Sequence, residues 1–276
     1  MSFWHHIIAR LPFEWAQFAF MQNALLAVLL IAPLFALIGC LVINNQMAFF
    51  SDAIGHAALT GIAIGALAGL ADPLWAMLAF ATALALLVSI LRQYSSASTD
   101  TVIALMMAFA VALGVVLLSR GGGFARYSRY LIGDLLTIAP FEILRLAILL
   151  AIVGGVWLAF FNPLFFTCLN RSLAKARGFP VWRLETFFAV IVALVVTVTI
   201  PWVGLLVINA LLIVPAAASR NMARTMTAYV LGAVIVSALA GILGLITSFY
   251  WGTATGATIV LWAMGFFILS LALRRR

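Results

Sequence analysis

Long apolar runs are the feature that most constrains how this chain can fold. They follow one another along the whole sequence, at about residues 20–43, 52–70, 73–92, 99–119, 139–161, 185–203, 205–219, 226–246 and 255–273. A helix needs about 20 mostly apolar residues to cross a bilayer, and all runs but the short seventh approach that length. The pattern predicts an all-α, polytopic transmembrane helical bundle of about nine spans, or eight if the seventh run is re-entrant.

The scarcity of charge excludes other classes of protein. Only 8% of the 276 residues are charged, against about 25% in an ordinary soluble domain. Such a chain cannot cover a water-facing surface, so we exclude a soluble enzyme. The net charge of +8 would suit nucleic acid, but no basic stripe with interleaved aromatic residues is present, and we expect no nucleic-acid partner. We expect one transmembrane domain over residues 1–276, with an amphipathic segment at 1–18.

The basic residues predict the orientation in the membrane, because cytoplasmic loops are enriched in Lys and Arg. A cytoplasmic carboxyl terminus and nine spans place the amino terminus outside. Most of the 15 basic residues then fall inside: Arg92, Arg171, Lys175, Arg177, Arg183, Arg220, Arg224, Arg274, Arg275 and Arg276.

The segment 162–184 carries much of this internal charge and is predicted to be a cytoplasmic loop. Within it, Leu169 to Arg177 can form a short amphipathic helix that Gly178 and Pro180 stop. Pro163 is expected to mark the edge of the preceding run. The loop is either a solvated segment that only fixes topology or a docking helix for a cytoplasmic partner.

Asp52 and His56 open the second apolar run, four residues apart and therefore on one helix face. An ionisable side chain at mid-membrane costs about 2.5–3.5 kcal/mol even on a lenient scale, so it marks function by default. A carboxylate and an imidazole suit a divalent metal such as zinc or manganese, although two ligands are too few for a closed site. A homodimer or a second helix could complete the set. The alternative is an ordinary Asp–His hydrogen bond near a helix end.

Two further spacings predict contacts between side chains or helices. Gly61, Gly65 and Gly69 recur every four residues and predict a close helix–helix approach. Glu142 and Arg145, three residues apart at the start of the fifth run, are expected to pair with each other.

Missing motifs narrow the function. The single lysine, Lys175, lies in no phosphate-binding loop, and the sequence holds neither a metalloprotease motif nor a nucleophile elbow. The chain is therefore predicted not to be its own classical ATPase, and an intramembrane hydrolase, which would have to build its site around one histidine, is disfavoured. His5 and His6 at the amino terminus could catch a metal loosely.

Several segments resemble the zinc/manganese permeases of ABC transporters, the ZnuB-like family. The segment from Met47 to Leu59, which contains Asp52 and His56, is similar to the family's signature. Further resemblances follow in the same order along the chain, at Tyr130 to Leu136, Leu173 to Gly178, Ala210 to Ala217 and Thr255 to Val260. The resemblance extends from about residue 12 to residue 273.

The resemblance implies a homodimeric, multi-pass permease of the bacterial cell (inner) membrane, without a permanently bound cofactor or enzymatic activity of its own. A separate cytoplasmic ABC ATPase powers alternating access, and an extracytoplasmic metal-binding protein delivers the ion. Asp52 and His56 take the role of pathway ligands for the transported Zn²⁺ or Mn²⁺. The role of coupling to the ATPase falls to Leu173, Ala174, Lys175, Arg177 and Gly178.

The sequence departs from the family in three places. Asn170 to Ser172 stand where the family has acidic residues, so we expect the ATPase to present an acidic rim to Arg171. Gly252 opens a segment in which the family's Asp and Pro are missing, and Thr60 replaces a common proline. The alternatives are an ABC permease for a metal chelate or cobalamin-like ligand, an ATP-independent secondary metal carrier and an intramembrane enzyme. A secondary carrier would show an inverted repeat, and none is evident.

Overall fold

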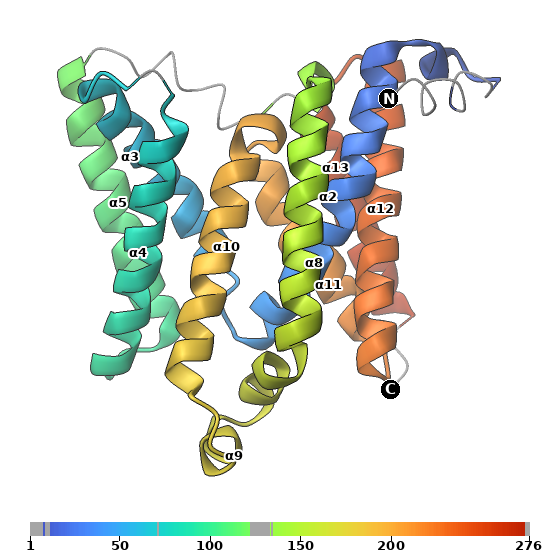
Figure 1. Ribbon diagram of the computed structural model, residues 1–276. Helices are drawn as coiled ribbons and strands as arrows, with labels where there is room; N and C mark the ends of the chain where they lie inside the picture. Colours follow the sequence, from blue (N-terminus) through green and yellow to red (C-terminus); the bar gives the residue numbers. More distant parts are fainter. Residues whose placement is uncertain (1–7, 9–11, 71, 122–132, 134, 274–276) are drawn as a thin grey trace. The chain divides into compact units, whose positions relative to one another are not determined.

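The computed structural model describes residues 8, 12–70, 72–121, 133 and 135–273 (Figure 1), and in this part of the chain there is no strand. His5, His6, Tyr130 and Asp134 lie outside the described residues. Two short 3₁₀ helices, η1 (Glu14–Gln17) and η2 (Leu135–Thr137), accompany the α-helices. The α-helices are α2 (Ala19–Asn44), α3 (Phe50–Leu67), α4 (Leu74–Tyr94), α5 (Thr99–Gly121), α8 (Pro140–Leu169), α9 (Arg171–Ala176), α10 (Val181–Val203), α11 (Leu205–Met222), α12 (Met226–Trp251) and α13 (Thr255–Ala272).

Each predicted apolar run corresponds to one long helix of the described residues. Eight of these helices, all but α11, are long and apolar enough to cross a membrane, and α11 contributes a shorter apolar stretch, Val207–Met222. Gly204, with φ +79°, separates α11 from α10, because a residue with positive φ cannot continue an α-helix and glycine adopts this backbone conformation at no steric cost. The prediction of an all-helical, polytopic protein is confirmed.

Pro163 does not end its helix, so the boundary that we predicted there is wrong. It lies inside α8, which continues to Leu169. Thr167 Oγ1 donates a hydrogen bond of 2.7 Å to the Pro163 carbonyl oxygen one turn earlier, and proline is tolerated inside transmembrane helices. Together α8, α9 and α10 take up most of the segment 162–184, which leaves only short connections around α9.

The chain forms two compact units, and each is described by itself. Unit 1 contains Met1–Cys40, Ile132–Gly155 and Trp202–Arg276, and unit 2 contains Leu41–Leu131 and Val156–Pro201. The division therefore falls within α2, α8 and α10.

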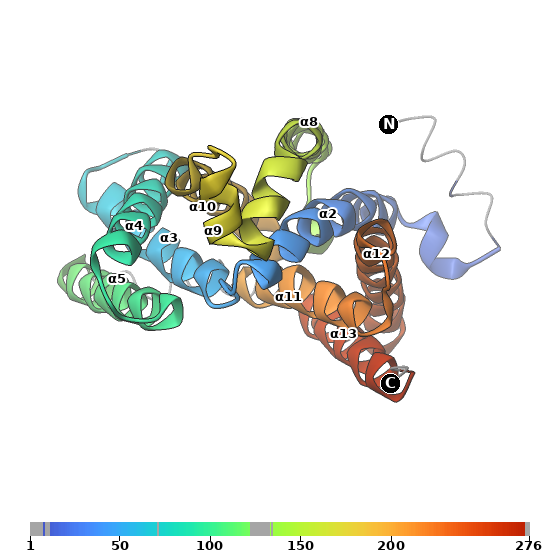
Figure 2. The ribbon, with the colours of Figure 1, turned by 90° about the horizontal axis from the view of Figure 1, so that it is seen from below.

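Helices α3, α4 and α5 lie side by side in unit 2 (Figure 2). A Cβ atom at Gly61 would lie 2.5 Å from Met77 Cα, and one at Gly65 would lie 3.1 Å from Ala76 Cβ, so both glycines let α3 approach α4 as predicted. Gly69 has a different role. It follows the end of α3 with φ +70° and has open space around it.

Thr60 joins α3 to α5 in the same unit. Its Oγ1 donates a hydrogen bond of 2.6 Å to the Ala110 carbonyl oxygen, and Gly114 makes room, since a Cβ there would lie 2.5 Å from Thr60 Oγ1. A proline at position 60 could not donate this bond. The departure from the family at Thr60 therefore accompanies a specific contact between two helices.

In unit 1, α11, α12 and α13 pack against one another. Gly244 of α12 approaches α13 so closely that a Cβ atom would lie 2.5 Å from Ile259 Cα. Gly39 of α2 contacts the backbone of α11 at Leu212. As in unit 2, small residues let the helix backbones approach closely.

Candidate functional site

The first turns of α3 place Asp52 and His56 together. His56 Nε2 lies 3.8 Å from Asp52 Oδ1, and the two side chains remain 32% and 35% exposed, respectively. Most of α3 is otherwise buried, including Ser51, Ala53 and Ile54 between and beside them. The pair is thus an accessible polar strip on a buried helix, and a carboxylate in the first turn is stabilised by the positive end of the helix dipole.

The chemistry of this pair matches part of a metal site. Carboxylate oxygen and imidazole nitrogen are both ligands for Zn²⁺ and Mn²⁺. Within the described ranges, no group of three or more His, Cys, Asp or Glu side chains could hold a metal ion. A closed four-ligand cage is therefore not built by these residues, and Asp52 and His56 would supply two ligands.

Local capping defines α9. Asn170 accepts a hydrogen bond of 3.0 Å from the Leu173 backbone N–H, which starts the helix two residues later than predicted. Gly178 ends the turn that follows, with φ +81°, as expected for a glycine after a helix. The sequence signal for the end of the helix was therefore more exact than the one for its start.

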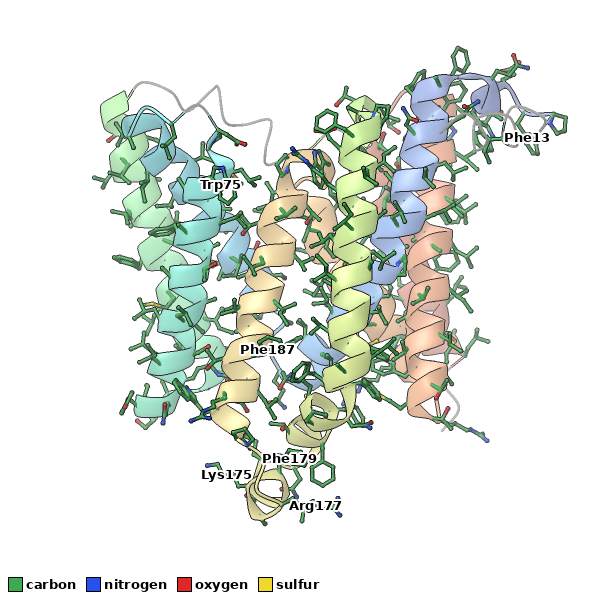
Figure 3. All side chains as sticks on the ribbon, in the orientation of Figure 1. Phe13, Trp75, Lys175, Arg177, Phe179 and Phe187 are labelled. Carbon is green, nitrogen blue, oxygen red and sulfur yellow. The ribbon has the colours of Figure 1, made fainter. Side chains whose placement is uncertain are left out.

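Around α9, one side is buried and the other is exposed. Ala174 is fully buried, whereas Leu173 remains 47% exposed. Figure 3 shows Lys175, Arg177 and Phe179 gathered around α9, beyond the end of α10. The Arg177 guanidinium lies over the Phe166 ring, 4.7 Å from its centroid, so one of the exposed cations is held by an aromatic side chain.

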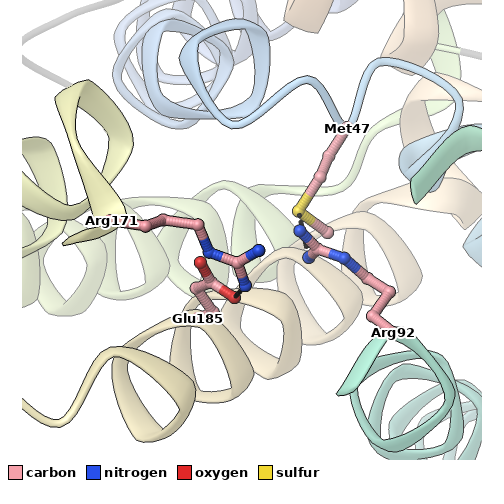
Figure 4. Close-up of polar contacts among 4 residues, drawn as sticks. All are labelled: Met47, Arg92, Arg171 and Glu185. Carbon is pink, nitrogen blue, oxygen red and sulfur yellow. Dashed lines mark hydrogen bonds and ion pairs between the residues drawn. The ribbon is translucent and has the colours of Figure 1, made fainter. Parts of the chain in front are cut away.

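A basic cavity that sequence reasoning missed lies beside α9, between the ends of α4 and α10. It has a volume of about 230 Å³, and its lining includes Arg92, Arg171, Lys175, Trp182, Glu185 and Thr186. Arg171 Nη2 donates a hydrogen bond of 2.5 Å to Glu185 Oε2, and Arg92 Nη1 contacts Met47 Sδ at 3.3 Å (Figure 4). The one sequence signal for this cavity was Glu185, a single acidic residue near the start of α10 that follows several basic residues.

Comparison with known proteins identifies the family of the chain. Residues 17–274 match ABC-3, the ABC 3 transport family. The chain belongs to the ABC 3 transport family. This match covers nearly the whole chain, so it includes both the Asp52 and His56 pair and α9.

Relatives of the ABC 3 transport family align with this chain over their whole length or most of it. The chain is 32% identical to the "High-affinity zinc uptake system membrane protein ZnuB" of Haemophilus influenzae, over 94% of this chain and 100% of that protein. It is 30% identical to the "Manganese import system permease protein ScaB" of Streptococcus parasanguinis, over 92% and 90%.

A solved structure shares the fold. "PsaBC from Streptococcus pneumoniae in complex with Fab" has a chain similar to this one, with a TM-score of 0.81 and 27% sequence identity, covering 98% of this chain and 95% of that chain. The apolar helices and the ABC 3 transport family together identify a multi-pass membrane protein.

The family-like segment Thr255 to Val260 has a packing role in the structure. Thr258 Oγ1 donates a hydrogen bond of 2.8 Å to the Gly244 carbonyl oxygen, and the hydroxyls of Ser248 and Thr255 lie 3.1 Å apart. These contacts join α13 to α12. Gly252, where the family's acidic residue is missing, ends α12 in the left-handed conformation with φ +61°.

The expected pairing of Glu142 with Arg145 is wrong. Glu142 accepts hydrogen bonds from Trp202 Nε1 at 2.8 Å and from the Ala139 backbone N–H at 2.7 Å. Arg145 instead lies over the Phe141 ring, 5.1 Å from its centroid. The carboxylate caps its own helix and reaches a residue 60 positions away, which no local spacing could reveal.

Proposed function

We propose that this chain is the membrane-spanning permease subunit of an ATP-driven importer for a divalent transition metal, Zn²⁺ or Mn²⁺. The observation that carries the proposal is the accessible Asp52 and His56 pair on an otherwise buried α3. The relatives named for zinc uptake and manganese import support the same class of cargo. Bound cofactors and catalysis by this chain have no part in the proposal.

Asp52 and His56 act as ligands along the transport pathway. A divalent cation accepts one carboxylate oxygen and one neutral imidazole nitrogen from this chain. A second copy in a homodimer would bring the same pair and complete a set of four. A transporter must also release its ion, and two ligands from each copy suit release better than a rigid cage.

The exposed side of α9 couples this chain to a separate cytoplasmic ATPase. Leu173, Lys175 and Arg177 provide one apolar and two cationic contacts, while Ala174 anchors α9 and Gly178 ends its turn. The short, capped helix moves as one unit and transmits movement from the ATPase. Because Arg171 already pairs with Glu185, an acidic rim on the ATPase would meet Lys175 and Arg177 more readily than Arg171.

The basic residues support the orientation of the chain in the bacterial inner membrane. Arg92 and the arginines around α9 would lie at the cytoplasmic side, with the carboxyl terminus inside and the amino terminus outside. An extracytoplasmic metal-binding protein would then deliver the ion from the opposite side.

Metal uptake by proteoliposomes tests the proposal. The liposomes contain this chain, its ATPase and its binding protein, and Zn²⁺ and Mn²⁺ are offered separately, with ATP or with a non-hydrolysable analogue. We expect uptake of at least one free ion only with ATP. Uptake without the ATPase would identify a secondary carrier instead. If a metal chelate accumulates while both free ions do not, the metal-ion proposal is wrong.

A further inference from the structure

The basic cavity beside α9 carries more positive charge than its own residues neutralise. Three cationic side chains, Arg92, Arg171 and Lys175, line it together with the carboxylate of Glu185. That carboxylate accepts its hydrogen bond from Arg171. The cavity therefore has an excess of positive charge that attracts an anion.

Arg92 is a partly buried cation of the cavity without a close ion-pair partner in the described part of the chain. It is half-buried, and among the described residues its guanidinium forms no ion pair and donates to a methionine sulfur, a weak acceptor. The guanidinium groups of Arg92 and Arg171 point toward each other (Figure 4). An anion between them would reduce their mutual repulsion.

A second observation points to a ligand with hydrogen-bond acceptors. Thr186 lines the same cavity, and its Oγ1 is buried without a hydrogen-bond partner in the described part of the chain. A buried hydroxyl without a partner is costly, and an acceptor oxygen in the cavity would satisfy it. Charge and hydrogen bonding thus favour the same kind of group, an oxyanion.

The position and size of the cavity indicate where the oxyanion comes from. The cavity lies at the ends of two apolar spans, α4 and α10, and Trp182 beside it is 45% exposed. Tryptophan is enriched at the membrane–water interface, and basic pockets between spans bind anionic lipid headgroups. The volume of about 230 Å³ lies below the roughly 300 Å³ at which drug-sized sites begin, which suits a compact phosphate group.

We propose that this cavity binds the phosphate headgroup of an anionic phospholipid, such as phosphatidylglycerol. Arg92 and Lys175, the latter shared with the proposed ATPase contact, provide the net positive charge, and Thr186 donates a hydrogen bond to a phosphate oxygen. Glu185 limits the affinity, because its carboxylate opposes the headgroup's charge. The proposal depends on the membrane spans and not on which cargo the protein transports.

Native mass spectrometry of the purified full-length chain tests this site. Phosphatidylglycerol and phosphatidylcholine with the same acyl chains are titrated onto the wild type and onto Arg92→Gln, Lys175→Gln and Glu185→Gln. We expect each loss of a cation to weaken phosphatidylglycerol binding by about 5-fold, and Glu185→Gln to strengthen it by a similar factor. Arg183→Gln is the matched control, because Arg183 is exposed near the same end of α10 and does not line the cavity.

Several outcomes would overturn the proposal. Equal weakening in Arg183→Gln would indicate diffuse attraction, and equal binding of phosphatidylcholine would exclude recognition of charge. Displacement of phosphatidylglycerol by millimolar inorganic phosphate would identify free phosphate as the ligand. If Arg92→Gln fails to fold, Lys175→Gln tests the proposal instead, because Lys175 is exposed and its replacement removes a charge without disturbing buried packing.

Discussion

The start of α3 and the helix α9 are both polar features of an apolar chain, but different forces hold them in place. Contacts at the backbone and one buried hydrogen bond fix α3 against its neighbours, at Gly61 and at Thr60. One side-chain cap, at Asn170, and one partly exposed ion pair, between Arg171 and Glu185, hold α9.

This difference determines how each region responds to change. A side chain added where two helix backbones are in contact clashes with the facing backbone, so the packed helices of the unit have to shift. A lost cap or ion pair at α9 affects mainly one short helix. The Asp52 and His56 pair, the proposed metal ligands, is therefore carried by a rigid element, whereas the proposed ATPase contact is carried by one that can fray locally.

The largest effect is expected at the pair itself. Asp52→Ala and His56→Ala should each lower ATP-driven metal uptake by more than about 100-fold, since even the loss of a partner behind a metal ligand costs about 10–100-fold. Uptake by proteoliposomes measures this. Asp100→Ala is the control, because Asp100 lies exposed in the first turn of α5. Normal uptake by both pair variants would show that the pair is structural.

A substitution at Gly61 tests the rigidity of α3. Gly61→Val should lower the free energy of unfolding by about 3 kcal/mol, the upper end of the usual cost of overpacking, because its Cβ would lie 2.5 Å from Met77 Cα. Thermal melting in detergent measures the loss. Gly154→Ala, where no atom would lie within 4 Å of the new Cβ, should be neutral or stabilising. Equal effects of the two variants would contradict the close approach.

The cap of α9 should matter less, and only locally. Asn170→Ala removes the acceptor for the Leu173 N–H and should destabilise α9 by about 1 kcal/mol. Hydrogen exchange should then quicken over residues 171–176, with weaker binding of the ATPase and an unchanged melting temperature. Asn170→Asp keeps the acceptor and should restore protection. A large drop in melting temperature would mean that α9 is part of the core.

The smallest effect is expected at the ion pair beside α9. Arg171→Gln should cost about 0.2–1 kcal/mol, as for other exposed pairs, because the Arg171 side chain is 59% exposed. A double-mutant cycle with Glu185→Gln measures the coupling, which should shrink in 1 M salt. A coupling well above 1 kcal/mol would make this ion pair, rather than the Asn170 cap, the main support of α9.

Sequence reasoning succeeded where one helix determines the answer. The spacing of Asp52 and His56 predicted a shared helix face, and Gly61 predicted close packing, because both depend on helical periodicity alone. It failed where partners lie far apart in the chain. Pro163 resembles a helix end by a local rule, but it lies inside α8, because apolar spans tolerate proline inside a helix.

The basic cavity and the partners of Glu142 show the same limit. Arg171 and Glu185 are 14 residues apart in the sequence, and Arg92 and Met47 are 45 residues apart. Glu142 accepts a hydrogen bond from Trp202, on a different helix, and does not pair with the neighbouring Arg145. The packing of separate parts of the chain brings such groups together, and apolar periodicity does not encode it.

The single carboxylate of the Asp52 and His56 pair also has an electrical consequence. With neutral imidazoles, a divalent ion held by one copy forms a complex of charge +1, whereas an ion shared by two carboxylates across a dimer axis forms a neutral one. Moving one charge through the full membrane potential is worth about 2.3 kcal/mol per 100 mV. Because the carboxylates stay with the protein, each imported ion still carries two positive charges inward in either arrangement, and a negative cell interior favours both; the two arrangements would differ only in how much charge moves in the loaded step.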